Sequence, residues 1–557
     1  MSRGAPTFPN RLRHRRRRGR MSAATLLCSL LWWCGCAQTA APIRIDPSGG
    51  LESAAVLLFA DGMDAARLSE LRAAGRLPNI DRLFYRGGTR CERAISALPP
   101  ITYVNAAALL TGCGPARSGI YGNRWFDPRT GFLRDYGSAA TFRRINDDLR
   151  TPTIHERLGE ARTANLHCHT RRGADISIDN TLVNGVDWAL GLFERVDQRT
   201  GDALAELDRR ARRNGGWPQL IIAYFPGLDE IGHRFGGDSQ RYARALETVD
   251  RQVGRIVEAL EAHPPAKRLL FALVTDHGHV TSRPERQADL VAELRRRTNL
   301  RIVTAPRTNP SGVVADSTWK RADLLAIIGA DRRAVLHISP SVAEGPARKR
   351  IAERLIAALD RPVATDAGVD AVGVLAMRDG DQGVRIVCDA RRAWVRRRSR
   401  GAVRQYRYEP DAADADPLGY LDRDDLRRFV QSGWHDSRAW LAATADAEYP
   451  DFVPQIAEYF TDPRGGDVIA FASDAASFGT RYAGGHGSAM ARDARVTVFF
   501  RGDGVPRGAV LSHARLVDIT PTLMDFLEAP PAAEPLAFDG VSLLNRIAAA
   551  SSPEPSR

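Results

Sequence analysis

Residues 269–278 read Leu269-Leu-Phe-Ala-Leu-Val274-Thr-Asp276-His277-Gly278, an apolar run that is followed at once by two polar side chains and a glycine. The run from Leu269 to Val274 is typical of a strand that is buried on both faces of a parallel sheet. A carboxylate and an imidazole at consecutive positions cannot both face a core, and Gly278 permits a turn that a side chain would hinder. The stretch therefore predicts a strand that ends at a site with metal-binding side chains.

Two more short apolar runs predict further buried strands of the same sheet. They are Ala54 to Ala60 and Leu220 to Phe225. The clearest helix covers residues 239–263, where apolar residues form one stripe between charged neighbours. This alternation predicts an α/β fold with a wound, mostly parallel central sheet that has helices on both faces.

The character of the sequence changes at residues 301–432, which we predict to form an inserted, cap-like α+β subdomain. Short alternating segments and clusters of like charge distinguish it from its flanks. Strand-like runs return at Val468 to Ala472 and Val496 to Phe500, so we expect the C-terminal part to complete the central sheet. The predicted organisation is a leader at 1–41, a catalytic core at 51–300 and 433–545, the insert between them, and a tail at 546–557.

Length and charge favour a globular protein without a specific nucleic-acid partner. The chain has 557 residues, of which 44% are hydrophobic, enough for a sizeable core. Of the formal net charge of +13, only +5 lies outside residues 1–20, because those hold eight arginines and no acidic residue. The basic segment Arg391 to Arg407 is expected to be the solvated face of a hairpin.

The N-terminal residues have the order of a secretory signal. Arginine-rich residues 11–20 precede an apolar stretch from Met21 to Trp33 and then small residues to Ala41. We therefore expect export to the periplasm or the extracellular space, with Met1 and Met21 both open as the start. Cys36 leaves a lipid anchor open beside ordinary cleavage, and such an anchor is the only membrane contact expected.

Four cysteines follow the leader, which is too few for a disulfide scaffold. They are Cys91, Cys113, Cys168 and Cys388. A pair between Cys91 and Cys113 is conceivable in an oxidising compartment.

Further polar residues follow the other predicted strands. Asp61 comes directly after Ala60, while Asp229 and His233 follow the strand that ends at Phe225 with a spacing that one helical turn would bring together. His486 lies in a glycine-rich loop, Gly-Gly-His-Gly. Open α/β sheets collect ligands at the carboxyl ends of their strands. The resulting six candidate ligands suit two divalent cations, zinc first, with other divalent metals open: Asp61, Asp229, His233, Asp276, His277 and His486.

Thr102 is the candidate nucleophile. It stands in Pro99-Pro-Ile-Thr102-Tyr-Val-Asn105, ahead of a small apolar helix at residues 106–110. A metal could deprotonate its hydroxyl group, and the unpaired amides at the helix N-terminus would stabilise an anionic ligand. The plain alternative is that Thr102 only caps the helix.

Together these residues resemble the alkaline phosphatase superfamily and, within it, the type I phosphodiesterase/nucleotide pyrophosphatase branch. The resemblance covers about residues 51–300 and 435–545. The motifs occur in family order: Asp61-Gly62, Thr102 with Asn105, Thr111-Gly112, Gly119-Ile-Tyr-Gly-Asn123, Asp229 to His233, Asp276-His277-Gly278, Gly485-His486-Gly487, Asp518-Ile-Thr-Pro-Thr522 and Asp539-Gly540.

The resemblance implies a hydrolase of anionic phosphoester small molecules with a two-zinc site. Asp229, His233 and His486 would hold one ion. Asp61, Asp276, His277 and Thr102 would hold the other. Thr102 would form a phosphothreonine intermediate, and Asn123 would donate a hydrogen bond to a phosphoryl oxygen.

Departures from the family pattern leave alternatives open. Tyr103 stands where the branch commonly has Phe, which bears on nucleotide specificity. Arg172 resembles the arginine of a Lys-x-Arg pair in monoester phosphatases, although Thr170 replaces the lysine, so a monoesterase with Arg172 in its substrate site is the main alternative.

Two other readings receive less support from the sequence. A phosphonate ester hydrolase is a less favoured alternative. A sulfate ester hydrolase is less favoured because the sulfatase-like Cys113-Gly-Pro-Ala-Arg117 lies at the wrong end of the short helix. A non-catalytic binding protein on the same scaffold would lack a ligand or the nucleophile, and none is missing.

Overall fold

A computed structural model describes residues 41–47, 50–305, 311–314, 318, 321–342, 344–380, 383–401, 403–412, 414–474, 476–479, 482–529 and 537–550. The predicted leader up to residue 40, with Cys36, and the tail from residue 551 lie outside the described residues. Within those ranges, no helix combines the length and the apolar character that crossing a membrane requires.

The central sheet is mostly parallel, as predicted. Its strand order is β22-β2-β21-β8-β1-β7-β5-β6, and β23 pairs with β2. Strands β8, β1, β7, β5 and β6 run parallel, whereas β21 is antiparallel to β8 and to β2. The bounds are: β1 Leu51–Ala60, β2 Thr89–Ile95, β5 Thr163–Leu166, β6 Ile176–Ile178, β7 Leu220–Phe225, β8 Ala266–Val274, β21 Arg495–Gly502, β22 Ala509–Val510 and β23 Ala514–Arg515.

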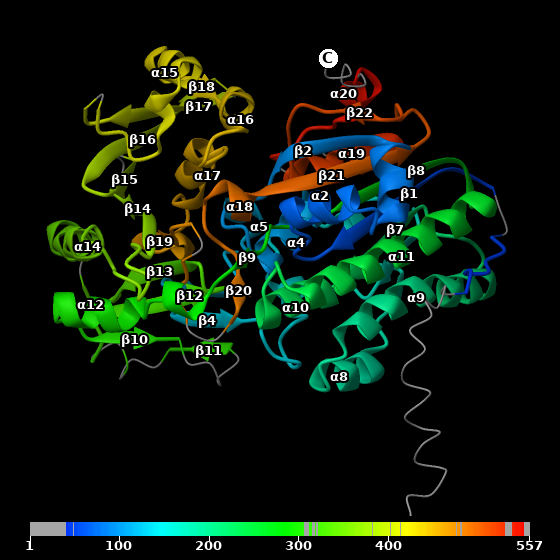
Figure 1. The fold of residues 1–557 in the computed structure, drawn as a ribbon, viewed down its shortest axis with the longest axis horizontal. Coiled ribbons are helices and arrows are strands. Elements are labelled where there is room, and N and C mark those ends of the chain that lie inside the picture. Colours follow the sequence, from blue (N-terminus) through cyan, green and yellow to red (C-terminus); the bar gives the residue numbers. More distant parts are fainter. Residues whose placement is uncertain are drawn as a thin grey trace, which may run out of the picture. The chain divides into compact units, whose positions relative to one another are not determined.

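Helices cover both faces of this sheet because successive residues of β1 point to opposite sides. Val56 and Leu58 belong to a core with α9 (Phe193–Arg213) and α11 (Gln240–Ala262). Leu57 and Phe59 belong to a second core with α4 (Thr102–Thr111) and α19 (Ile519–Phe526). Figure 1 shows α9 and α11 side by side. The predicted helix 239–263 is thus confirmed as α11.

A second, mostly antiparallel sheet contains the middle of the chain. Its order is β10-β12-β13-β19-β14-β15-β16-β17-β18. The bounds are: β10 Ile302–Thr304, β12 Leu324–Gly329, β13 Arg333–Ile338, β14 Val372–Arg378, β15 Val384–Cys388, β16 Arg391–Arg400, β17 Val403–Pro410, β18 His435–Asp436 and β19 Val468–Ala472. Helices α12 (Leu290–Thr298) and α14 (Pro346–Leu359) contribute to a core with this sheet.

One predicted strand of the central sheet was wrong. The run Val468 to Ala472 forms β19, which pairs with β13 and β14 in the second sheet. A run that is buried on both faces looks the same in any sheet, so its composition does not identify its neighbours. The run Val496 to Phe500 does join the central sheet, as β21. The insert boundary at residue 432 stays a prediction, and the second sheet takes strands from both sides of it.

The predicted hairpin at Arg391 to Arg407 is confirmed as β16 and β17. Glutamates pair with its arginines, since Arg396 contacts Glu409 while Arg397 and Arg404 contact Glu458. The four described cysteines are unpaired, so the conceivable bridge between Cys91 and Cys113 does not form.

The remaining elements are short. The helices are: α2 Ala65–Ala73, α3 Pro78–Ile80, α5 Pro115–Ser118, α6 Ile145–Asp148, α7 Ile154–Arg157, α8 Thr181–Ala189, α10 Gly227–Phe235, α15 Asp424–Gln431, α16 Ser437–Thr444, α17 Phe452–Tyr459, α18 Ala491–Ala494 and α20 Leu544–Ala548. Strands β3 (Arg124–Asp127), β4 (Phe132–Asp135) and β11 (Ser311–Val313) form one small sheet, and β9 (Val280–Thr281) pairs with β20 (Gly484–Gly485).

Candidate metal centre

The carboxyl ends of three adjacent parallel strands bring the candidate ligands together. Asp61 follows β1 directly, Asp276 follows β8 by two residues, and Asp229 lies in the first turn of α10, just after β7. Since β1 pairs with both β7 and β8, these three carboxylates meet at one edge of the sheet. The sequence prediction of a strand-end site agrees with this placement.

The first cluster consists of Asp61, Asp276 and His277, all buried. His277 Nε2 lies 3.4 Å from Asp61 Oδ1 and 3.2 Å from Asp276 Oδ2. Those two carboxylate oxygens are buried and accept no hydrogen bond from the protein. Buried anionic oxygens without partners are costly, and a cation between them and the imidazole would remove that cost.

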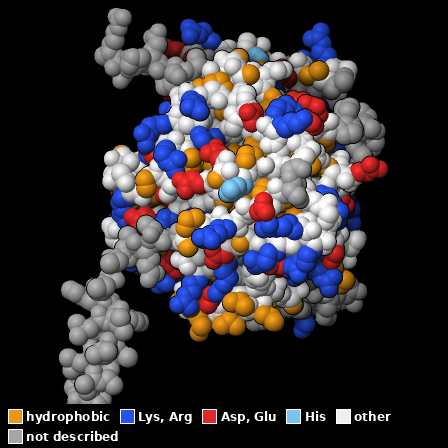
Figure 2. Space-filling model, turned by 90° about the vertical axis from the view of Figure 1, so that its right-hand side faces the viewer, with side chains coloured by type: hydrophobic (Ala, Val, Ile, Leu, Met, Phe, Trp, Pro, Cys, Tyr) orange, Lys and Arg blue, Asp and Glu red, His pale blue; other side chains and the backbone are white. Residues whose placement is uncertain are grey.

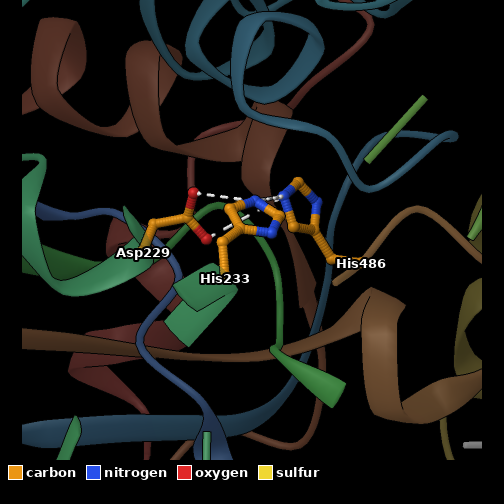
Figure 3. Close-up of side chains that lie close together, drawn as sticks. All are labelled: Asp229, His233 and His486. Carbon is orange, nitrogen blue, oxygen red and sulfur yellow. Dashed lines mark hydrogen bonds and ion pairs between the residues drawn. The ribbon is translucent and has the colours of Figure 1, made fainter. Parts of the chain in front are cut away.

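The second cluster consists of Asp229, His233 and His486 (Figure 3). Asp229 and His233 are four residues apart on α10, so one helical turn brings His233 Nε2 within 3.3 Å of Asp229 Oδ2. His486 follows β20 directly, and its Nε2 lies 3.2 Å from His233 Nε2 and 3.8 Å from Asp229 Oδ1.

Backbone carbonyl groups hold all three ligand histidines in the same tautomer. The Nδ1 atoms of His233, His277 and His486 lie 2.9 Å from the carbonyl oxygens of Gly484, Gly278 and Pro100. A carbonyl oxygen only accepts, so each Nδ1 carries a proton, and in the neutral ring each Nε2 presents a lone pair to its cluster. The facing lone pairs of His233 and His486 repel each other unless a proton or a cation lies between them.

The two clusters are neighbours. The rings of His277 and His486 stack with their centroids 3.4 Å apart and their planes 9° apart. Each ring belongs to a different cluster, so ions held by the two clusters would lie close enough to act on one ligand. Imidazole and carboxylate donors in groups of three suit catalytic zinc, which takes three protein ligands and keeps one further position open.

When no cation is bound, the charged groups of the two clusters shift one another's pKa values. Burial, then the carboxylates of Asp276 and Asp229, raise the pKa of Asp61 well above its usual range. Burial likewise raises the pKa of Asp276. For His233 burial disfavours the charged form, but the Asp229 carboxylate outweighs it and raises the pKa to about 9. The donor set therefore favours uptake of positive charge, as a metal centre requires.

Thr102 lies at the first cluster. Its Oγ1 is 3.3 Å from His277 Nε2, and it is the first residue of α4. The capping position belongs to Ile101, and no side chain caps this helix, so Thr102 is not a simple N-cap. Asn105 fixes the preceding loop, because its side-chain amide bonds the backbone of Ala97, Pro99 and Ile101.

Asn123 is held beside Tyr103, the residue that follows Thr102. Its Oδ1 accepts a hydrogen bond from the Tyr103 backbone amide at 3.1 Å. Its amide nitrogen is therefore the group left to donate to a substrate oxygen. Arg172 is placed differently, since its guanidinium donates to the Glu156 carboxylate and to the carbonyl groups of Asn146, Leu149 and Thr151. These contacts commit the Arg172 guanidinium to groups of the protein itself.

Two residues in contact with the ligands were missed in the sequence. His279 is buried, and its Nδ1 lies 3.2 Å from Asp229 Oδ1. The Tyr224 hydroxyl group donates to Asp61. The signal for His279 was its position two residues after His277, whereas Tyr224 sits inside an apolar strand and gave none. Both side chains orient ligands, a role that often matters as much as ligation.

The fold and the site define an alkaline-phosphatase-like α/β protein with an inserted domain and two adjacent candidate metal sites. The sequence profile of the type I phosphodiesterase / nucleotide pyrophosphatase family matches residues 55–368. The chain belongs to this family, as its motifs predicted.

Similar proteins agree with this assignment. An uncharacterised pyrophosphatase/phosphodiesterase of Schizosaccharomyces pombe is 27% identical over 41% of this chain and 45% of its own length. Ectonucleotide pyrophosphatase/phosphodiesterase family member 1 of Mus musculus is 27% identical over 47% of this chain and 28% of its own. The chain thus spans less than half the length of these curated relatives.

Solved structures show the same fold. Human ectonucleotide pyrophosphatase/phosphodiesterase 5 superimposes with a TM-score of 0.51 and 12% identity, covering 90% of this chain and 100% of that one. The murine protein in an inactive form, in complex with AMP, gives a TM-score of 0.51 and 13% identity, with the same coverage.

Proposed function

We propose that this chain is an exported, two-zinc phosphodiester hydrolase that works through a phosphothreonine intermediate at Thr102. The observation that carries the proposal is the convergence of three histidine Nε2 lone pairs and three buried carboxylates beside the Thr102 hydroxyl group. Each cluster would hold one ion, with Asp61, Asp276 and His277 sharing theirs with Thr102.

The chain's own residues supply the nucleophile and orient the substrate. Thr102 Oγ1 bonds to phosphorus while the bond from phosphorus to the leaving oxygen breaks. The hydroxyl proton passes to solvent, and the leaving oxygen takes up a proton. Water then hydrolyses the phosphothreonine, which restores the hydroxyl group and releases a phosphate monoester. Backbone amides at the start of α4 and the Asn123 amide nitrogen donate to the phosphoryl oxygens.

Bound divalent cations would lower the pKa of the Thr102 hydroxyl group and stabilise charge on the attacking and leaving oxygens. His279 and Tyr224 position the carboxylates of Asp229 and Asp61 for that role.

The hydrogen bonds of Arg172 to the protein itself favour a diester over a monoester as the substrate. A monoester carries one more negative charge, and the arginine expected to meet it already donates to Glu156 and three carbonyl groups. A sulfate ester hydrolase lacks support for a different reason. Cys113 follows the far end of α4, roughly 16 Å along the helix axis from Thr102.

A nucleotide-like leaving group is the first choice for the substrate, because the relatives are named as nucleotide pyrophosphatases. Tyr103 lies next to the nucleophile, but Tyr136 stacks on it at 4.6 Å between centroids and His169 contacts it at 4.3 Å. A nucleobase would therefore have to contact the edge of this cluster. Export rests on the signal-like leader and on relatives named ectonucleotide or venom enzymes.

The test compares kcat/KM for an aryl phosphate diester and the matching monoester on zinc-loaded protein. We expect preference for the diester and loss of its hydrolysis by orders of magnitude in Thr102→Ala, with zinc content unchanged. Thr130→Ala, which removes a hydroxyl group from an exposed turn, is the matched control and should stay near the wild type.

Three outcomes would contradict the proposal. Strong preference for the monoester would establish the phosphatase alternative. Activity retained in Thr102→Ala would remove the threonine mechanism. Tight zinc binding without turnover of either ester, or of a nucleotide diester, would favour the binding-protein alternative.

A further inference from the structure

Helix α8 (Thr181–Ala189) exposes its apolar face and turns its polar face toward the protein, the reverse of an ordinary surface helix. Its polar side chains face the protein, because the Asn184 side chain bonds the Asp179 carbonyl and Arg199. Asp187 is buried and also pairs with Arg199, which belongs to α9. Surface helices normally bury their apolar stripe and expose their charged one. In α8 the ion pair and the hydrogen bonds attach the polar face to the protein, and the apolar face is exposed to solvent.

The outward face is strongly apolar. Leu182 is 86% exposed, Val186 58% and Leu190 67%. Of the large hydrophobic side chains that are exposed among the described residues, most lie between 182 and 190. Figure 2 shows a hydrophobic patch at the lower edge of the molecule, where Figure 1 places α8. So dense a patch on one helix indicates an apolar binding partner.

Arginines contact both ends of the helix, and each also pairs with a carboxylate, Arg143 with Asp179 at 3.2 Å and Arg241 with Glu194 at 3.7 Å. Arg143 donates to Thr181 Oγ1 at 2.7 Å, at the N-terminal end. Arg241 donates to the carbonyl of Gly191 at 3.2 Å, beyond the C-terminal end. Arg241 also stacks on Phe235, which is itself 40% exposed. Long cationic side chains beside an exposed apolar stripe are typical of helices that lie in a membrane interface.

Trp188 completes this arrangement. It is 36% exposed and packs edge-on against Phe193 with the centroids 5.0 Å apart. A half-exposed tryptophan at the margin of an apolar face is suited to the boundary between headgroups and acyl chains.

We propose that α8 docks this protein on a lipid bilayer surface that carries anionic headgroups. The apolar face of α8 enters the interface, and the ion-paired arginines at its two ends lie at the level of the headgroups. The rest of the chain suits such a surface, since it keeps a positive formal charge even without its arginine-rich first twenty residues.

The size of the patch favours a bilayer over a second copy of the chain. Helix α8 has nine residues, and the five exposed large apolar side chains at residues 182–190 present on the order of 500 Å² of accessible surface. A stable dimer buries about 800 Å² of accessible surface on each partner, which is more than this face offers. An interfacial helix needs no matching surface, because lipid adapts to a convex apolar ridge.

The first test is co-sedimentation of the full chain with vesicles of 70% phosphatidylcholine and 30% phosphatidylglycerol. We expect the triple variant Leu182→Ser, Val186→Ser, Leu190→Ser to lower the bound-to-free ratio by at least about tenfold relative to the wild type, because each change removes an apolar group from the interface. Val403→Ser with Val541→Ser is the matched control, since it removes exposed apolar side chains from other elements. The control should stay within about twofold of the wild type.

A second measurement reports contact at α8 itself, independent of any contribution from residues 1–40. Bromine-labelled lipids should quench tryptophan fluorescence more in the wild type than in Trp188→Phe. Equal quenching in both proteins would overturn the proposal. So would vesicle binding that the triple variant leaves unchanged, or a concentration-dependent dimer that this variant abolishes.

The substituted side chains are exposed, so the fold should survive, and unchanged far-ultraviolet circular dichroism checks this. If the triple variant unfolds, Leu182→Ser alone carries the test, with a smaller expected loss. Hydrolysis of a soluble diester should be unaffected by every α8 variant, so failure of membrane docking and failure of the proposed catalytic function are distinguishable.

Discussion

The imidazole rings of His277 and His486 stack face to face, although each belongs to a different candidate metal cluster. His277 follows strand β8 of the central sheet, whereas His486 follows β20, more than 200 residues later. Their Nδ1 atoms donate to separate backbone carbonyl groups, so both rings are fixed from behind. The stack joins two clusters that come from distant segments of the chain. We therefore expect each cluster to bind its own ion, and binding of one ion to change the affinity for the other.

Metal content should fall by one ion per chain for each cluster that is damaged. His486→Ala removes an Nε2 donor from the second cluster, and His277→Ala removes one from the first. We expect about two zinc ions in the wild type and about one in each variant, measured by inductively coupled plasma mass spectrometry after dialysis. The exposed His263→Ala is the control and should keep both. Equal metal content in all four proteins would show that these clusters are not the metal sites.

His279 should act as a positioning residue for Asp229. Because its Nδ1 contacts Asp229 Oδ1 and its ring packs against Gly232 and Gly484, His279→Ala should weaken zinc affinity by roughly 10- to 100-fold. Competition with a chromogenic chelator measures this affinity. His279→Asn keeps a donor near the same position and should recover part of the loss. Identical affinities for the Ala and Asn variants would mean that His279 acts only by filling space.

The candidate ligands were predictable because each follows a recognisable local signal. Asp61 comes directly after a buried strand, Asp276 follows another by two residues, and Asp229 with His233 have helical spacing. Their approach to one another follows from parallel pairing of β1 with both of its neighbours, which the pattern of buried strands already implied. Local sequence thus carries most of this site.

Contacts between distant segments were not predictable. Strand β19 has the same apolar composition as a central strand, yet it pairs with β13 and β14. Arg172 resembles a substrate-binding arginine, yet Glu156 of α7 holds its guanidinium. In both cases the neighbours that decide the outcome come from elsewhere in the fold, and single-sequence patterns do not encode them.

The buried ion pair between Arg332 and Asp493 should stabilise the loops that carry His277 and His486. Both side chains are fully buried, with Arg332 Nε 2.9 Å from Asp493 Oδ1. The Asp493 carboxylate also accepts from the Ser488 backbone amide, two residues after His486, and the Asp493 backbone carbonyl accepts from the Gly278 amide, next to His277. Arg332→Ala leaves an unpaired buried carboxylate and should cost about 3–5 kcal/mol of unfolding free energy.

Urea denaturation measures this loss. The double variant Arg332→Ala, Asp493→Asn removes both charges and keeps a side-chain oxygen to accept from the Ser488 amide, so it should be less destabilised than Arg332→Ala alone. A double variant that is less stable than the single one would show that the cost comes from lost packing rather than from the unpaired charge.

Stability should decrease with rising pH because of Asp197. This carboxyl group is buried on α9, and its Oδ1 accepts from the Gly227 amide at the start of α10, while Oδ2 has no hydrogen-bond partner. Burial raises its pKa from 3.8 to about 8. At neutral pH the folded state therefore keeps a proton that the unfolded state releases. The contribution of Asp197 is fully present below about pH 4 and is lost as the pH rises through 8.

The free energy of unfolding, measured in urea at pH 5, 6.5 and 8, should fall across this window by at most about 1.4 kcal/mol per pH unit from this group. Asp197→Asn cannot ionise but retains an oxygen for the Gly227 amide, so its stability should depend less on pH than that of the wild type. Asp202→Asn, an exposed change on the same helix, should keep the wild-type dependence. If Asp197→Asn and the wild type lose stability in parallel, the carboxyl group already carries a charge in the folded state at neutral pH, and other groups cause the decline.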